Sequence, residues 1–208
     1  GDVYKRQAVK WVVSQNVCDL VSPPRKQRFE IQPLSVEQVQ ILLVTVHGHK
    51  WEALYVLALA TGMRRGELLG LKWQDINFAT RTVQVRRILS RVPTHMPDRE
   101  HVYVEAEPKT DKSRRSLTLA PFALEALQEH YDHQLAAKLK AGEIWQDFDY
   151  VFCTGHGTHL NPNHVVDEFK ELLKQAGLPD IRFHDLRHSA ATLLLGLDVH
   201  PKVVQEML

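Results

Sequence analysis

Three short segments of the chain hold side chains of the types that handle phosphate: Thr61–Glu67, Lys109–Arg115 and His184–His188. The first contains Arg64 and the third contains Arg187, and a guanidinium is permanently charged and grips two oxygens at once. Histidine moves a proton near neutral pH. No metal motif or phosphate-binding loop accompanies the three segments. The set therefore suits an anion with two unesterified oxygens, such as a phosphodiester.

Arg64 follows a Thr-Gly break between two predicted helices, and backbone N–H groups at a helix start favour anions. Glu67, three residues on, is placed to hold the Arg64 guanidinium. The competing interpretation is a surface ion pair between Arg65 and Glu67, worth under ~1 kcal/mol.

His184 and Arg187 are three residues apart, so they share one helix face, and His188 lies one turn from His184. One alternative is that His184 caps a helix. Another is a metal site, because two zinc ligands use the His184/His188 spacing. That motif needs Glu beside its first histidine, where this chain has Asp185. The further candidate ligands are the loop histidines His156, His159 and His164.

Lys109 is predicted to lie in a turn between strands, where a lysine can donate a proton to a leaving alkoxide. The alternative is an ordinary exposed basic turn. From Arg81 to Arg115 nine Lys and Arg residues face five Asp and Glu residues, a local charge of +4 on a chain of net charge +1. Such a field marks either a polyanion-binding face or a solvated hairpin.

The composition excludes several classes of protein. The 208 residues are 44% hydrophobic and 25% charged, as in a globular domain, and no run of about 18 apolar residues predicts a membrane span. No secretion leader opens the chain. Cys18 and Cys153 form no paired motif, which favours a reducing, cytoplasmic location.

The hydrophobic periodicity predicts a mostly α fold with one small antiparallel β-sheet (α+β). Ser35 is the expected cap of a helix that runs to Val46. The other predicted helices cover residues 50–60, 65–71, 162–176 and 185–196, one that begins at Pro121, a partial one at 8–21 and a last one that begins at Pro201. Alternating residues predict strands at 82–85, 101–105 and 115–119, paired in a single sheet.

Taken together, the three segments resemble the catalytic domain of tyrosine recombinases of the phage-integrase type. Thr61–Leu68 resembles the first arginine box of that family, Pro108–Arg115 its β-hairpin lysine segment, and Phe183–Thr192 its second box. Their order and spacing agree with the family over residues 28–208. Residues 29–208 are then the catalytic domain, 8–28 the end of a core-binding domain with its linker, and 1–7 a sequencing artefact.

The resemblance implies that Arg64 and Arg187 clamp the phosphate, with Lys109 as general acid and His184 as an acid/base or positioning group. Glu67 and His188 support them. The residues expected to contact double-stranded DNA are Arg86, Lys112, Arg114 and Arg115. The implied reaction forms a 3′-phosphotyrosyl bond without metal, nucleotide or other cofactor. The implied assembly is a tetramer on paired sites, with possible accessory DNA-bending proteins.

The family continues beyond a segment like 203–208 with a Gly-His turn and then the tyrosine nucleophile. Neither lies within the 208 residues, and all five tyrosines precede His184: Tyr4, Tyr55, Tyr103, Tyr131 and Tyr150. We therefore expect this polypeptide to bind DNA without cleaving it. The alternative function is a non-catalytic DNA-binding module.

Overall fold

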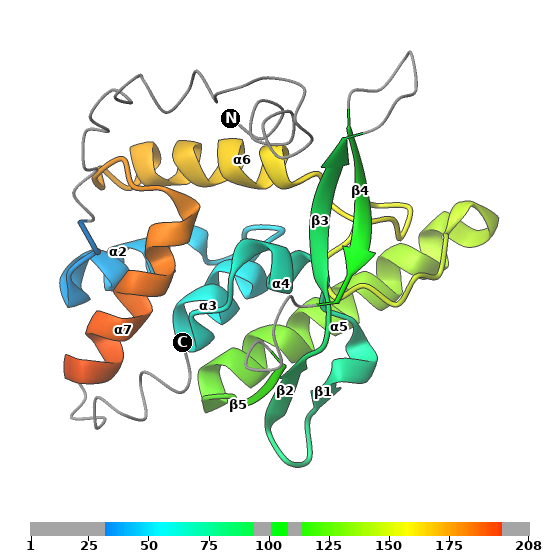
Figure 1. Ribbon diagram of the computed structural model, residues 1–208, viewed down its shortest axis with the longest axis horizontal. Helices are drawn as coiled ribbons and strands as arrows, with labels where there is room; N and C mark the ends of the chain where they lie inside the picture. The colour runs from blue at the N-terminus through cyan, green and yellow to red at the C-terminus, as the bar shows by residue number, and fades with distance from the viewer. Residues whose placement is uncertain (1–31, 94–100, 108–113, 197–208) are drawn as a thin grey trace, which may run out of the picture. The chain divides into compact units, whose positions relative to one another are not determined.

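One apolar helix, α3 (Glu52–Thr61), is the element on which the others pack (Figure 1). The computed structural model describes residues 32–93, 101–107 and 114–196. Within these ranges α3 contacts α2 (Val36–Val46), α4 (Arg65–Leu69), α5 (Pro121–Ala141) and α7 (Leu186–Gly196). A helix that is apolar on all sides must be buried on all sides, and eight of its ten residues are buried.

The predicted helix boundaries at both ends of the α2–α3 unit are confirmed. The Ser35 hydroxyl accepts a hydrogen bond from the backbone N–H of Gln38, whose side chain accepts one from the Ser35 N–H. This reciprocal cap satisfies two N–H groups that a helix start leaves open. Gly62 ends α3 in the left-handed conformation, with φ of 61°. The chain therefore turns sharply just before Arg64.

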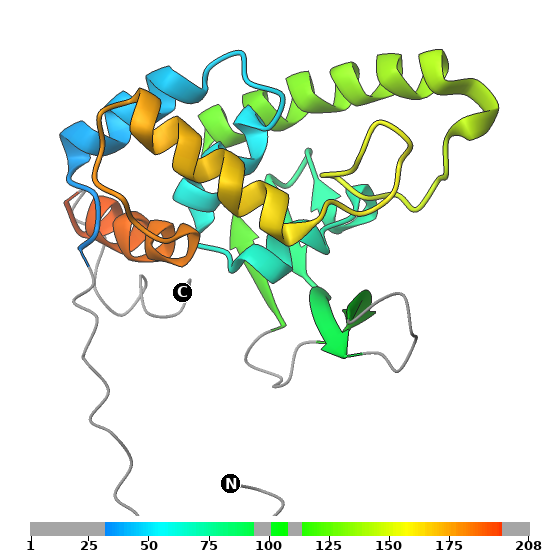
Figure 2. The ribbon, with the colours of Figure 1, turned by 90° about the horizontal axis from the view of Figure 1, so that it is seen from above.

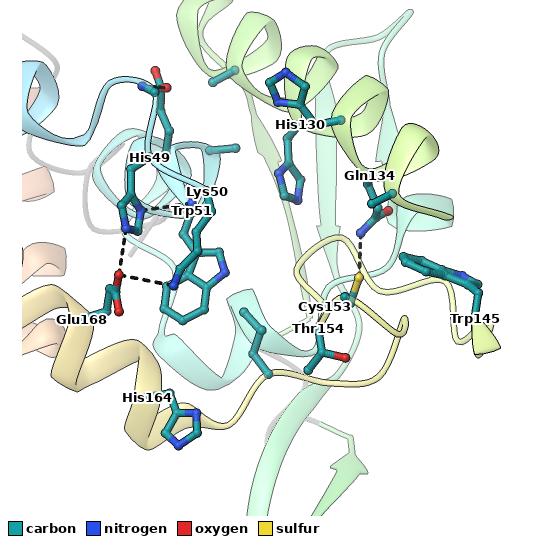
Figure 3. Close-up of a pocket in the computed structure, with 18 residues that line it drawn as sticks. His49, Lys50, Trp51, His130, Gln134, Trp145, Cys153, Thr154, His164 and Glu168 are labelled. Carbon is teal, nitrogen blue, oxygen red and sulfur yellow. Dashed lines mark hydrogen bonds and ion pairs between the residues drawn. The ribbon is translucent and has the colours of Figure 1, made fainter. Parts of the chain in front are cut away.

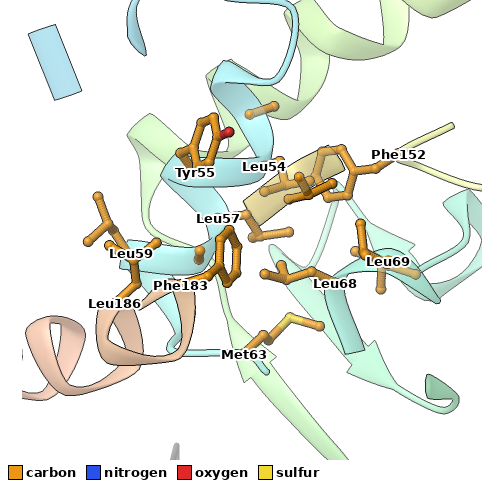
Figure 4. Packing of buried hydrophobic residues seen from close by; sticks show 14 of the residues in the cluster. Leu54, Tyr55, Leu57, Leu59, Met63, Leu68, Leu69, Phe152, Phe183 and Leu186 are labelled. Carbon is orange, nitrogen blue, oxygen red and sulfur yellow. The ribbon is translucent and has the colours of Figure 1, made fainter. Parts of the chain in front are cut away.

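The core beneath this turn is aromatic and aliphatic (Figure 4). Tyr55 of α3 stacks on Phe169 of α6 (Pro162–Gln175), with ring centroids 5.8 Å apart. Phe183, which opens the short 3-10 turn Phe183–Asp185, meets Phe169 edge to face at 5.4 Å. The core therefore joins α3 and α6 to the 3-10 turn before α7, next to the phosphate-type segments that begin at Thr61 and at His184.

The prediction of a single β-sheet is wrong, because the strands divide between two sheets. β2 (Thr82–Val85) lies between β1 (Ile76–Asn77) and β5 (Arg115–Thr118) in an antiparallel sheet. β4 (His101–Ala106) pairs instead with β3 (Ile88–Pro93), a strand that the pattern did not predict. β3 and β4 are neighbours in the sequence, so their pairing closes only a short loop. The entropy cost of loop closure is therefore small.

Helix α4 approaches the backbone of β3 closely, and two glycines make this approach possible. A Cβ atom on Gly70 would lie 3.0 Å from the backbone nitrogen of Leu89, and one on Gly66 would lie 3.1 Å from the Leu89 oxygen. Figure 2 shows α4 between α6 and the β3–β4 hairpin. The hairpin is thus fixed against the helix that follows Arg64.

The predicted fold class agrees with the structure, whereas one helix boundary and the exposure of two side chains differ from the prediction. The fold is helical with small antiparallel sheets, and α4 ends at Leu69 rather than Leu71 because Gly70 caps it. Tyr131 and Leu135 of α5 are 40% and 46% exposed, although their spacing placed them with buried Leu127. Among the described helices, none is both long enough and apolar enough to cross a bilayer. The helices expected at 8–21 and from Pro201 lie outside the described residues.

The central position of α3 predicts a large penalty for a cavity within it. Leu57 is fully buried, whereas Val44 on α2 is 78% exposed. We expect Leu57→Ala to lower the free energy of unfolding by about 2–5 kcal/mol, measured by urea denaturation. The control Val44→Ala should change it by less than about 0.5 kcal/mol. Equal effects of the two substitutions would contradict this packing.

Candidate active site

Arg64 lies at the start of α4 and is bound to Glu67 through both its backbone and its side chain. Its backbone N–H donates to Glu67 Oε2 at 2.9 Å, and its Nη1 donates to Oε1 at 2.9 Å. The Glu67 side chain is 1% exposed, while the Arg64 side chain is 50% exposed. The predicted support of Arg64 by Glu67 is therefore the arrangement that the structure has, and the Arg64 guanidinium still reaches solvent.

A second arginine binds the same carboxylate from the sheet. Arg115, the first residue of β5, donates from Nη1 to Glu67 Oε1 at 3.2 Å and from Nη2 to Oε2 at 3.1 Å. The Arg115 side chain is 10% exposed. This paired geometry is the strong form of an arginine–carboxylate contact. It ties the beginning of β5 to α4, across 48 residues of sequence.

The Glu67 carboxylate is charged despite its burial. Burial by itself raises the pKa of Glu67, and the hydrogen bonds from Arg115 and Arg64 more than reverse this, so that the pKa is lowered. A buried carboxylate that accepts four hydrogen bonds is fully satisfied, and removal of one partner leaves a buried charge uncompensated.

Arg187 approaches this group from α7. Its Nη1 donates to the backbone oxygen of Gly62 at 2.5 Å, two residues before Arg64. Burial, followed by the positive charges of Arg64 and Arg115, lowers the pKa of Arg187 to about 10, while Glu67 opposes this shift. Arg187 therefore stays charged at neutral pH and lies within electrostatic reach of all three. Three guanidinium groups around one carboxylate leave an excess positive charge, which favours an anion.

His184 and His188 lie close to Arg187, although His184 belongs to the 3-10 turn Phe183–Asp185 and not to the helix that carries Arg187 and His188. Their rings are 5.9 Å apart and perpendicular. Burial lowers the pKa of His184, and the nearby His188 and Arg187 lower it further. The imidazole of His184 is therefore neutral at neutral pH, the form that can accept a proton or a hydrogen bond.

Contacts that the sequence did not reveal hold the 3-10 turn Phe183–Asp185, which carries His184. Asp185 is buried and accepts hydrogen bonds from the backbone N–H, Nε and Nη2 of Arg182 at 2.8–3.1 Å. The Ser189 hydroxyl donates to the backbone oxygen of Asp185 at 3.2 Å and accepts from the backbone N–H of Leu34 at 2.9 Å. Ser189 is a polar residue at a buried position of α7, and this was the signal in the sequence that could have indicated these contacts.

Three of the predicted DNA-contacting arginines, Arg86, Arg114 and Arg115, line a groove of about 680 Å³ between the two sheets. The side chains of Arg86 and Arg114 are 53% and 52% exposed. Arg86 Nε donates to the Gln84 side chain at 2.9 Å, and Arg114 pairs with exposed Glu107 at 2.6 Å. Arg87, which was not among the residues selected from the sequence, also lines the groove and pairs with buried Asp75.

Not every predicted site residue can be placed. Lys109 and Lys112 lie outside the described residues. Arg115 is placed, with its guanidinium on a buried carboxylate rather than on an open basic surface. The structure therefore brings together Arg64, Glu67, Arg115, Arg187 and the two histidines His184 and His188.

A separate cavity of about 700 Å³ opens at the other end of α3 (Figure 3). Within it Glu168 accepts from His49 at 3.0 Å and pairs with Lys50 at 3.4 Å. Of the candidate residues named from the sequence, only His164, of the metal alternative, lines this cavity. Among the described residues no group of three or more His, Cys, Asp or Glu side chains is arranged to hold a metal ion, and this includes His156, His159 and His164 of the metal alternative.

Comparisons with known proteins identify the family of this chain. The model of the phage integrase family matches residues 33–208. A tyrosine recombinase described as XerC-like, from Caldanaerobacter subterraneus subsp. tengcongensis, is 35% identical over 192 residues, which cover 90% of this chain and 49% of the relative. An integrase from Saccharopolyspora erythraea is 29% identical over all of this chain and 57% of its own length. The chain thus spans about half the length of these curated relatives.

Solved structures show the same fold. The Tn1549 transposon integrase in complex with a circular intermediate DNA superposes with a TM-score of 0.72 at 21% identity, over 98% of this chain and 66% of that one. The XerA recombinase superposes with a TM-score of 0.67 at 23% identity, over 90% of this chain and 57% of that one.

The buried Glu67 predicts a specific dependence of stability on pH. Because the folded-state pKa of Glu67 lies below its ordinary value of 4.5, its stabilisation is complete above that value and is lost as pH falls through the folded-state pKa. We expect Glu67→Gln to lower the free energy of unfolding by about 2–3 kcal/mol at pH 7, measured by urea denaturation. The difference from the wild type should shrink below pH 4.5. A difference that stays constant down to pH 3 would contradict the assignment.

Proposed function

The chain belongs to the phage integrase family of tyrosine recombinases, and we propose that it contributes the catalytic domain of a site-specific recombinase. The substrate is double-stranded DNA, and the reaction is a metal-independent transesterification at one phosphodiester. The observation that carries the proposal is the convergence of Arg64 and Arg187, which are far apart in the sequence: Arg64 pairs with Glu67, and Arg187 donates to the backbone oxygen of Gly62, two residues before Arg64.

In the proposed reaction the two guanidinium groups neutralise the non-bridging oxygens of the scissile phosphate, which stabilises the charge that develops in the transition state. A tyrosine oxygen attacks phosphorus, the bond to the 5′ oxygen breaks, and Lys109 donates the proton that the leaving oxygen takes up. Neutral His184 accepts the proton that the attacking tyrosine hydroxyl loses, or positions the phosphate while the solvent takes up that proton. The 3′-phosphotyrosyl bond conserves the energy of the broken bond, so that no nucleotide cofactor is needed.

We further propose that the 208-residue polypeptide binds DNA but forms no covalent adduct. Of the four described tyrosines, Tyr55 is buried in the core, and the hydroxyl of Tyr150 donates a hydrogen bond to Glu105 Oε1 at 2.6 Å. Tyr103 lies 3.5 Å from the Asn161 side chain, and Tyr131 packs on Trp73. The hydroxyl contacts found for these described tyrosines do not include Arg64 or Arg187.

Exposed Arg86 and Arg114 extend the positive surface beside the cluster and support the proposed contact with flanking phosphates. A tetramer on paired DNA sites, with accessory DNA-bending proteins, is the assembly that the family resemblance implies. A cytoplasmic location fits a DNA substrate. Residues 29–208 are proposed as the catalytic domain, preceded at 8–28 by the end of a core-binding domain, with 1–7 as an artefact.

The test measures duplex binding and adduct formation separately. Fluorescence anisotropy with a 30-base-pair duplex should show binding that weakens steeply with salt. Arg187→Ala should weaken it about tenfold and lower the salt slope by about one. The control Lys140→Ala removes an exposed charge from α5 and should have little effect.

A chain extended at its C-terminus to the length of its relatives should form a covalent adduct with a nicked suicide substrate, and Arg187→Ala should abolish the adduct. Duplex binding without any adduct from the extended chain would instead support the non-catalytic DNA-binding module. Absence of duplex binding by the wild type would overturn both functions.

A further inference from the structure

We propose that Arg115 is a positioning residue that acts as the buried counter-ion of Glu67 and thereby leaves the charge of Arg64 available to a phosphate. The inference rests on the proposed function, because it assigns Arg64 to a phosphate. It differs from the expectation that Arg115 contacts DNA itself.

The exposed fractions of the Glu67, Arg115 and Arg64 side chains indicate which arginine is the counter-ion of Glu67. Glu67 is 1% exposed and Arg115 is 10% exposed, whereas Arg64 is 50% exposed. A buried charge is stable only if a partner is buried with it. Arg115 meets this requirement, and the half-exposed Arg64 remains partly hydrated and open to a ligand.

The hydrogen bonds lead to the same assignment. Arg115 offers two guanidinium N–H groups to the two carboxylate oxygens, at 3.2 and 3.1 Å. Arg64 offers one guanidinium N–H and its backbone N–H. Among the groups that lower the pKa of Glu67 against the effect of burial, the hydrogen bond from Arg115 is the largest. The backbone bond from Arg64 persists whatever its side chain does.

The charge balance gives Arg115 an effect at a distance. Arg64, Arg115 and Arg187 together carry three positive charges against the single negative charge of Glu67, so the cluster has a net charge of +2 when all are ionised. Without Arg115, Arg64 becomes the neutralising partner of Glu67, and the net charge falls to +1. The positive field at the phosphate site then weakens although no contact to the phosphate is lost.

A charge-conserving double substitution separates this role from direct DNA contact. Arg115→Gln removes one positive charge, and we expect it to weaken binding of a 30-base-pair duplex about tenfold, the loss typical of one charge-assisted hydrogen bond. Adding Glu67→Gln restores the net charge of +2. We therefore expect the double variant to recover most of the lost affinity. If Arg115 contacts a phosphate directly, the double variant keeps a salt slope about one unit smaller than that of the wild type, because one phosphate contact stays lost, and the inference is wrong.

Two companion variants guard against misfolding and nonspecific charge effects. Arg115→Lys keeps the charge without the fork of two donors, so it should fall between the wild type and Arg115→Gln. Lys140→Gln removes one exposed positive charge elsewhere and should bind within about twofold of the wild type. Thermal unfolding of each variant establishes that it is folded. The inference would also be overturned if the Arg115→Lys variant is folded and still binds the duplex as weakly as Arg115→Gln.

A readout without DNA keeps the inference distinct from the proposed function. The pKa of Glu67, measured by ¹³C NMR titration of its carboxyl carbon, should lie below 4.5 in the wild type and rise in Arg115→Gln. If the wild type fails to bind duplex DNA, the proposed function falls and this titration still decides the inference. An unchanged pKa in folded Arg115→Gln would show that Arg115 is not the counter-ion.

Discussion

The burial of one carboxylate, Glu67, is the constraint on which the phosphate-type site depends. A charged carboxylate with 1% of its side chain exposed must receive donors on both oxygens, and here they come from the start of α4 and from the start of β5. These donors are the two arginines nearest to it, so one requirement of burial holds both in place. The negative charge of the same carboxylate also offsets the electrostatic repulsion among Arg64, Arg115 and Arg187.

The surrounding fold makes this burial possible. The left-handed turn at Gly62 ends α3 and exposes the carbonyl oxygen that Arg187 binds, so the break in the helix and the placement of the second arginine have one cause. The close approach of α4 to β3 at Gly66 and Gly70 fixes the hairpin against the helix that carries Glu67. The aromatic contacts of Phe183 hold the His184 turn on the core beneath. Each of these features positions a charged group through packing of uncharged ones.

Local signals in the sequence predicted the helices well, because caps and breaks act within a few residues. The Ser35 cap and the Gly62 break are of this kind, and both are confirmed. The arrangement of strands depends on which distant segments pair, and the single predicted sheet is in fact two. The contact between Arg64 and Glu67 could be predicted because the two residues carry opposite charges and are three residues apart. The partner of Arg115 lies 48 residues away, and no local pattern distinguishes a buried counter-ion from a DNA contact.

The central claim is that Arg64 and Arg187 converge on one phosphate while Arg115 remains on Glu67. The most direct measurement is a crystal structure of the chain bound to a DNA duplex. The account predicts one phosphate within hydrogen-bond distance of both the Arg64 and Arg187 guanidinium groups, with the paired Arg115–Glu67 contact intact. A structure in which the two arginines hold different phosphates, or in which Arg115 leaves Glu67 to bind DNA, would contradict it.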